Sequence, residues 1–262
     1  MPTPAPLVVL IAVLGLAIGS FLNVVVYRVP RQESIVSPGS HCPTCSTPIK
    51  GRHNVPVLSW LVLRGRCHSC HERISLRYPL VEGGTALLFV ALTLRFGLTL
   101  ELPAYLYLAA VGIALALIDF DVRRLPDTIV LPSYVVSLLL LMPAGADAPS
   151  TAVTTRALGG MLALLVLFFA LAAAYPNGLT FGDVKLAGLV GLYLGWLSWS
   201  ALFITAIGSL LIAAVSGIGV IMTRNASRYI AVPLAPCLIG AGVLSLFVAA
   251  PLSTWYASLL TV

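Results

Sequence analysis

Four cysteines stand in two short turns whose spacing is that of a metal site. The turns are Cys42-Pro-Thr-Cys45 and Cys67-His-Ser-Cys70, and 21 residues separate them. Each Cys-x-x-Cys turn lets two thiolates converge on one tetrahedral ion, so two turns complete a zinc coordination sphere with no open position. A closed sphere indicates a structural zinc rather than a zinc-activated water. Two disulfides or four free thiols are the alternatives.

Four histidines near these turns are alternative zinc ligands, and a fifth cysteine stands apart. Histidines beside a zinc module are more often solvated than bound. Cys237 lies within an apolar stretch and is expected to be an inert packing residue. The histidines are His41, His53, His68 and His71.

The acidic residues are the second group that could do chemistry. The chain has only nine, and an Asp at the centre of a membrane helix costs about 2.5 to 3.5 kcal/mol, so such acids tend to mark function. Asp119 ends an apolar run, where the helix macrodipole disfavours a negative charge. Pairing with Arg123 is its structural alternative. Asp121 is expected to be solvated or paired with an arginine, Asp127 to favour a helix N-terminus, and Glu82 to lie nearby.

Asp183 lies in the other acidic segment, three residues after Thr180. It can serve as the N3 acid of a capping box with Thr180 as the N-cap, which is a purely structural role. Gly182 permits close backbone approach or an unusual dihedral beside the carboxylate. Lys185 is expected to lower the cost of ionising Asp183.

A meeting of Asp119 and Asp183 would create an acid–base pair. In a semi-dry pocket, repulsion and desolvation make two carboxylates share one proton near neutral pH. One then activates a water that attacks a peptide carbonyl, and its protonated partner donates to the carbonyl oxygen. No serine–histidine nucleophile, HExxH zinc site or phosphate-binding glycine loop competes in the sequence. The residues alone leave the catalytic and structural interpretations equally open.

The elements that position these groups are membrane helices. Of 262 residues, 59% are hydrophobic and 9% charged, whereas a soluble domain has roughly 25% charged residues. The net charge of +6 comes from basic residues that are mostly beside the spans. These residues are expected to set the membrane topology and contact lipid headgroups rather than bind nucleic acid. The first stretch is kept as a span because no basic residue precedes it. The eight expected spans are Leu7–Tyr27, Pro79–Phe96, Pro103–Phe120, Asp127–Leu141, Arg156–Tyr175, Asp183–Trp196, Ser200–Met222 and Ile230–Val248.

The distribution of Lys and Arg predicts the orientation. The long polar insert Arg28–Tyr78 holds eight of the fifteen, which indicates a cytoplasmic location. That location disfavours disulfides. If eight spans follow one another from this cytoplasmic insert, thirteen of the fifteen Lys and Arg residues, including Arg224 and Arg228, lie on the cytoplasmic side. Both acidic segments, Asp119–Asp127 and Asn177–Lys185, then lie at the cytoplasmic face. We expect an all-α polytopic membrane protein with a zinc-ribbon-like insert between its first two helices, divided as 1–28, 29–78 and 79–262.

The chain resembles the bacterial type IV prepilin peptidases over nearly its full length. The resemblance rests on the four cysteines, on Asp119 eight residues before Asp127, and on several long motifs. These motifs are Gly19-Ser-Phe-Leu-Asn-Val-Val-Val-Tyr-Arg-Val-Pro30, Asn54-Val-Pro-Val-Leu-Ser-Trp60, Arg64-Gly-Arg-Cys67, Ile74-Ser-Leu-Arg-Tyr-Pro-Leu-Val-Glu82, Leu125-Pro-Asp127 and Phe181-Gly-Asp-Val-Lys-Leu186.

The resemblance implies a GxGD-type aspartyl protease of the bacterial inner membrane. It implies cleavage of basic leaders from prepilins or pseudopilins after Gly, then N-methylation of the new N-terminal Phe with S-adenosylmethionine as donor. Asp119 and Asp183 would be the catalytic pair, the four cysteines would hold zinc, and Gly65 matches a glycine linked to methyl transfer. Thr180 replaces the first Gly of GxGD, which puts the local turn in doubt. Loops near Asn177 and in the insert are expected to position the leader.

Three other functions compete with this one. A transporter or channel would use the acids for protons or cations, but it leaves the cysteines unexplained, and its acids are expected nearer the bilayer midplane. A catalytically silent adaptor would use the zinc module to recruit partners. A protease without methyl transfer is the third, because no donor-binding loop is recognisable. The expected partners are prepilins, pseudopilins and membrane lipid, without nucleic acid, and a homodimer is compatible with the sequence.

Overall fold

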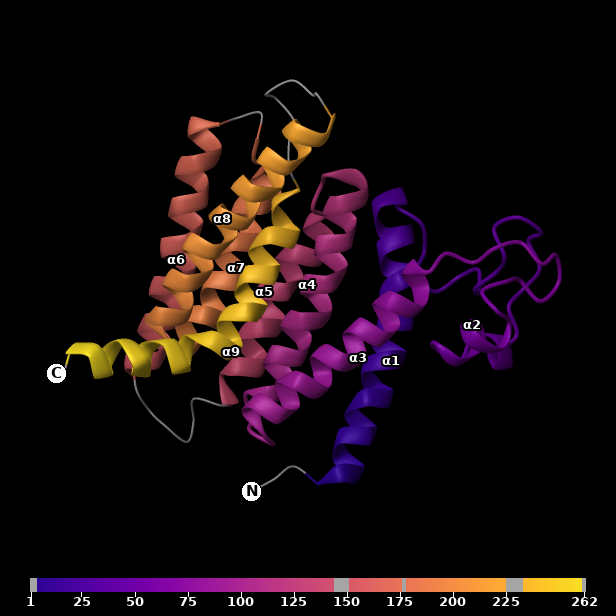
Figure 1. Ribbon diagram of the computed structural model, residues 1–262, viewed down its shortest axis with the longest axis horizontal. Helices are drawn as coiled ribbons and strands as arrows, with labels where there is room; N and C mark the ends of the chain where they lie inside the picture. Colours follow the sequence, from indigo (N-terminus) through magenta and orange to yellow (C-terminus); the bar gives the residue numbers. More distant parts are fainter. Residues whose placement is uncertain (1–3, 144–150, 176–177, 225–232, 261–262) are drawn as a thin grey trace. The chain divides into compact units, whose positions relative to one another are not determined.

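The computed structural model describes residues 4–143, 151–175, 178–224 and 233–260. Within them the chain is helical, with two isolated β-bridges as its extended pairing. The chain divides into two compact units, Met1–Leu102 and Pro103–Val262. The α-helices are α1 (Ala5–Arg28), α2 (Leu58–Val62), α3 (Arg77–Phe96), α4 (Leu102–Val122), α5 (Asp127–Leu141), α6 (Thr151–Ala174), α7 (Phe181–Leu197), α8 (Trp199–Arg224) and α9 (Leu234–Leu260) (Figure 1).

The expected helical architecture is confirmed. Every expected span corresponds to one helix, with α2 as an additional short helix in the insert. Six helices of the described residues are long and apolar enough to cross a membrane by length and composition, namely α1, α3, α4, α6, α8 and α9. The helices α5 and α7, which correspond to the remaining two expected spans, are shorter. At a rise of 1.5 Å per residue, α5 is about 22 Å long and α7 about 26 Å. The chain is therefore a multi-pass membrane protein.

Parts of three expectations lie outside the described residues. Asn177 and Arg228 belong to segments that the structure does not describe, as does the start of the eighth expected span at Ile230. The described part of that span begins at Leu234, the first residue of α9.

In the first unit, two glycines let α1 pack closely against α3. A Cβ atom added at Gly15 would lie 2.6 Å from the Cα of Ala86, and one added at Gly19 would lie 2.7 Å from the Cα of Glu82. Small residues four apart are a frequent device for close packing of membrane helices, since they let the backbones approach. The contact fixes the position of Glu82 on α3.

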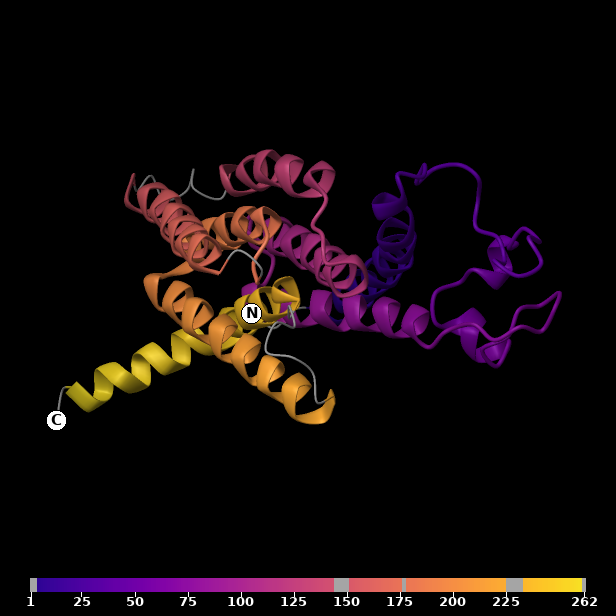
Figure 2. The ribbon, with the colours of Figure 1, turned by 90° about the horizontal axis from the view of Figure 1, so that it is seen from above.

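In the second unit, α7 is the central helix. It contacts α5, α6, α8 and α9 (Figure 2). Every residue from Leu186 to Trp196 is buried. The crossing with α6 is close because Gly160 faces Gly191 and Gly195, where added Cβ atoms would collide with backbone.

Arg156 of α6 binds the C-terminal end of α7. Its Nε donates to the carbonyl of Gly195 at 2.7 Å, and its Nη2 donates to those of Trp196 and Leu197 at 2.6 and 3.2 Å. A cation at a helix C-terminus satisfies carbonyls that lack intrahelical partners. This contact holds the far end of the helix whose first turn carries Asp183.

Candidate active site and metal centre

Asp119 lies near the C-terminal end of α4 and is almost fully buried. Its side chain is 4% exposed, and its Oδ2 accepts a hydrogen bond from the backbone N–H of Ala235 at 3.0 Å. Ala235 is in the first turn of α9, where free N–H groups and the helix dipole favour a negative charge. The structural alternative, a pairing with Arg123, is not contradicted, because the charge of Arg123 also acts on this carboxylate.

Asp183 is buried in the first turn of α7. Its Oδ2 accepts from both the backbone N–H and the hydroxyl of Thr180, each at 2.8 Å, and the Thr180 oxygen accepts in turn from the N–H of Asp183. The expected capping box is therefore confirmed. Its Oδ1 is also buried, yet it has no hydrogen-bond partner in the structure.

A buried carboxylate oxygen without a partner is costly unless a ligand or water completes it. The charge of Asp183 acts on Asp119, so the structure brings the two acids near each other. Each keeps one oxygen on a backbone N–H. The buried Oδ1 of Asp183 remains for a water or a substrate, as acid–base chemistry requires.

Thr180 does not distort the start of α7. Its φ of −104° and ψ of 160° are extended backbone, which any residue adopts. The side chain adds a donor to Asp183 that a glycine lacks. The replacement of the first Gly in the motif therefore leaves an ordinary helix start.

Gly182 is required for a close approach and not for an unusual dihedral. A Cβ atom there would lie 2.8 Å from the Cβ of Leu125, which precedes α5. The absence of a side chain at Gly182 lets the loop between α4 and α5 lie against the turn that carries Asp183.

The expectation that Lys185 assists Asp183 is wrong. Lys185 Nζ lies 2.8 and 2.9 Å from the two carboxylate oxygens of Asp127, with which it forms an ion pair. On a helix, Lys185 is two residues beyond Asp183 and points to a different side. Asp127 is in the first turn of α5, as expected, and Asp121 is exposed.

The four cysteines of the insert come together in the first unit. Their sulfur atoms all lie within 4.8 Å of one another, and the Cys42 and Cys70 sulfurs are 3.8 Å apart. A Zn–S bond of about 2.3 Å in a tetrahedron requires a separation of roughly 3.8 Å between ligand sulfurs. All four thiols are free, so the disulfide alternative is wrong.

The two cysteine turns repeat one local structure. In the first turn, the N–H of Cys42 donates a hydrogen bond to the carbonyl of Thr47, and the N–H of Ser46 donates one to the carbonyl of Cys42. In the second, Cys67 and His71 make the equivalent bonds. Ser46 and His71 both adopt positive φ, and an isolated antiparallel bridge flanks each turn. Two similar turns facing each other are typical of a zinc ribbon.

Hydrogen bonds favour the metal-binding thiolate form of two of these cysteines, whereas burial and the neighbouring thiols raise the pKa of Cys70 to about 12. The side chain and backbone of Thr47 lower the pKa of Cys45 to about 6, and the backbone N–H groups of Cys70 and Ser69 lower the pKa of Cys67. No histidine joins the cluster among the described residues. The rings of His53 and His68 instead contact each other in a tilted arrangement, with centroids 4.3 Å apart.

Gly65 and Glu82 occupy special positions in the first unit. Gly65 has a φ of +66°, and an added Cβ would lie 2.7 Å from the ring of Trp60, so only glycine fits. Glu82 is 8% exposed, and its Oε2 accepts from the N–H of Val57 in the insert at 2.7 Å.

The sequence interpretation missed Ala235, whose backbone N–H binds Asp119, because a backbone donor carries no signal of its own in a sequence.

Two family models match the chain. The bacterial peptidase A24 N-terminal domain matches residues 13–96, and the type IV leader peptidase family matches residues 106–222. Curated relatives named prepilin leader peptidase/N-methyltransferase include those of Pseudomonas putida (37% identical, covering 91% of this chain and 90% of the relative), Aeromonas hydrophila (37%, 94% and 92%) and Neisseria gonorrhoeae (36%, 80% and 80%). No solved structure matches. The family resemblance is thus confirmed in both units, and the chain belongs to the type IV leader peptidase family.

Proposed function

We propose that the chain is an intramembrane aspartyl endopeptidase that removes the leaders of type IV prepilins or pseudopilins and then N-methylates the new N-terminus. The observation that carries the proteolytic step is the buried pair Asp119 and Asp183, with the partnerless Oδ1 of Asp183. The printed names of the relatives supply the substrate class and the second activity. A transporter function is not favoured, because the relatives that match this chain are named as leader peptidases and methyltransferases.

In the proposed reaction the two carboxylates share one proton. The ionised carboxylate takes a proton from a water whose oxygen attacks the scissile carbonyl carbon, and the protonated one donates to the carbonyl oxygen. When the tetrahedral diol collapses, the C–N bond breaks, the carboxyl that took the proton from water gives it to the leaving nitrogen, and the other carboxylate takes back the proton of one diol hydroxyl. The N–H groups of Ala235 and Thr180 hold the two carboxylates in place throughout.

We assign a structural zinc ion to Cys42, Cys45, Cys67 and Cys70. The donor set is four thiols, and the separation of Cys42 and Cys70 suits a tetrahedral ion. Zinc would staple the insert, whose described part has little regular structure of its own. S-adenosylmethionine would supply the methyl group, and homodimerisation and lipid contacts remain parts of the proposal.

We place the insert and both acids on the cytoplasmic side of the inner membrane. The eight basic residues of the insert support this orientation through the positive-inside rule. A prepilin has a basic leader followed by an apolar helix, so its scissile bond would lie at the level of such a site.

The test is cleavage of a peptide with a basic leader ending in Gly before Phe, followed by mass spectrometry. We expect Asp119→Asn and Asp183→Asn each to abolish cleavage, because Asn keeps the acceptor oxygen for Ala235 or Thr180 but cannot exchange the proton. Asp127→Asn is the matched control, since that acid is exposed and paired with Lys185. Cleavage that survives either of the first two substitutions would refute the two-carboxylate mechanism.

A further inference from the structure

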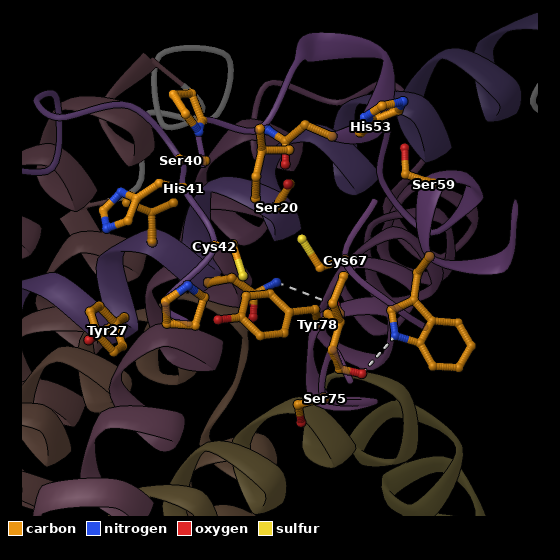
Figure 3. A pocket seen from close by; sticks show the side chains of 18 of the residues that line it. Ser20, Tyr27, Ser40, His41, Cys42, His53, Ser59, Cys67, Ser75 and Tyr78 are labelled. Carbon is orange, nitrogen blue, oxygen red and sulfur yellow. Dashed lines mark hydrogen bonds between the residues drawn. The ribbon is translucent and has the colours of Figure 1, made fainter. Parts of the chain in front are cut away.

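A large cavity lies in the first unit. Its volume is about 1220 Å³, and it is lined by α1, the cysteine insert and the first turns of α3 (Figure 3). Small-molecule sites are usually about 300–1,000 Å³. The cavity therefore has room for a drug-sized ligand together with the end of a peptide chain. Cys42 and Cys67 are part of its wall, so the proposed zinc would shape it.

Four aromatic residues line this cavity from three different elements, Phe21 and Tyr27 of α1, Trp60 of α2 and Tyr78 of α3. Trp60 is held in place, because its Nε1 donates to the carbonyl of Ile74 at 3.1 Å and Gly65 lies against its ring. Tyr27 and Tyr78 are 51% and 45% exposed, although Arg31 already covers one face of the Tyr27 ring at 4.0 Å. Such rings can stack on a purine or face a cation.

A buried carboxylate and a strained backbone meet at the wall of the same cavity. Glu82 and Val57 both line it, and the N–H of Val57 donates to Glu82 Oε2 at 2.7 Å. Val57 has a φ of 60°, which is an outlier for a β-branched residue. Ser59 supports this turn by accepting from the N–H of Val55. Strained conformations of this kind persist where the surroundings enforce them, and they cluster at ligand sites.

We propose that this cavity binds S-adenosylmethionine, with Glu82 as the carboxylate acceptor and Trp60 as the aromatic wall. The inference rests on the methyltransferase half of the proposed function. The ligand has a purine, a ribose diol and a sulfonium cation. An aromatic ring can stack on the purine, and a carboxylate can accept hydrogen bonds from the ribose hydroxyls or attract the cation. Glu82 has further acceptor capacity besides its hydrogen bond from the N–H of Val57.

A basic leader peptide is the rival occupant of the cavity. The cavity wall carries three carboxylates and two guanidinium groups, so its charge suits the sulfonium donor as well as a basic peptide, and the titrations below distinguish the two. The overall reaction transfers a methyl group from the sulfonium sulfur to the α-amine nitrogen of the cleaved pilin. The amine loses a proton, and the sulfur becomes a neutral thioether.

The first experiment titrates the full chain in detergent with S-adenosylhomocysteine while tryptophan fluorescence is recorded. The chain has four tryptophans, and only Trp60 lines this cavity. We expect saturable quenching in the wild type, its loss in Trp60→Phe and its retention in Trp199→Phe. Quenching that persists in Trp60→Phe would overturn the assignment.

The second experiment measures binding of radiolabelled S-adenosylmethionine by equilibrium dialysis. We expect Glu82→Gln to raise Kd at least about tenfold, because a charged acceptor becomes neutral. Glu101→Gln is the matched control, since this acid lies in the same unit but not in the cavity wall. Zinc content and melting temperature verify folding, and Trp60→Phe replaces Glu82→Gln if the latter fails to fold.

The outcomes separate this inference from the proposed function. If the wild type binds the donor and methylates cleaved pilin while both cavity variants bind as tightly as it does, the cavity is wrong and the function stands. If the wild type neither binds nor methylates, the inference and the methyltransferase activity both fail. Quenching of Trp60 by a basic leader peptide but not by the donor would instead identify the cavity as a peptide groove.

Discussion

A single methyl group at Gly182 should separate the two acidic segments. In Gly182→Ala the new Cβ would lie 2.8 Å from the Cβ of Leu125, whereas carbon atoms pack best at about 3.5–4.0 Å. The loop between α4 and α5 must then move by about 1 Å relative to the start of α7. Leu125 is six residues after Asp119 and is 8% exposed, so it has little free space in which to turn aside.

The expected cost follows from these distances. Overpacking of this kind costs about 1–3 kcal/mol of stability, and a misplacement of about 1 Å in a catalytic site can cost about 10²-fold in rate. We therefore expect Gly182→Ala to stay folded but to cleave a prepilin peptide about 100-fold more slowly than the wild type.

The assay compares initial cleavage rates and melting temperatures of purified variants. Gly178→Ala is the matched control, because it lies in the same connection and its added Cβ would make only ordinary contacts of 3.6 and 3.8 Å with Tyr175. Gly182→Ala with a wild-type rate would refute the reasoning, since the loop would then tolerate displacement without effect on the acids.

Three further predictions concern the supports of the site. Thr180→Val removes the hydroxyl that bonds Asp183 and should cost about 1 kcal/mol, whereas Thr180→Gly should cost only a few tenths, as measured by chemical unfolding. Arg156→Met should lower the melting temperature, because three carbonyls lose a charged donor and one such bond contributes about 1.5–3 kcal/mol. Cys42→Ser should reduce zinc below one ion per chain by metal analysis and make the insert more sensitive to proteolysis.

Matched variants distinguish these effects from general damage. Arg124→Met changes an exposed arginine and should leave the melting temperature unchanged. Cys237→Ala removes a cysteine outside the cluster and should keep one zinc per chain. A Thr180→Val variant as stable as the wild type would contradict the role given to the capping hydroxyl.

Features that depend on neighbouring residues could be predicted from the sequence. α5 begins at Asp127 and ends at Leu141, as expected, because a proline stands just outside each end. The capping box needs only Thr180 and Asp183 at the right spacing. The cysteine cluster follows from two turns of identical spacing, although the shared positive φ at Ser46 and His71 was not foreseen.

Features that depend on distant residues could not be predicted in this way. Lys185 pairs with Asp127, 58 residues away, although Asp183 is nearer in sequence. Arg156 binds the end of α7, because the carbonyls there offer partners that only packing reveals. The role of Glu82 in holding Val57 also required the structure.

The two carboxylates are held by contacts of very different range, and this makes them unequal. Asp183 is bound by Thr180, three residues away, so its geometry is set as soon as the first turn of α7 forms. Asp119 is bound by Ala235, 116 residues away, so its geometry exists only when α9 packs against α4. A perturbation that shifts the start of α9 should therefore displace Asp119 while Asp183 stays in place. Activity in the proposed mechanism is thus coupled to the packing of α9 directly through Asp119.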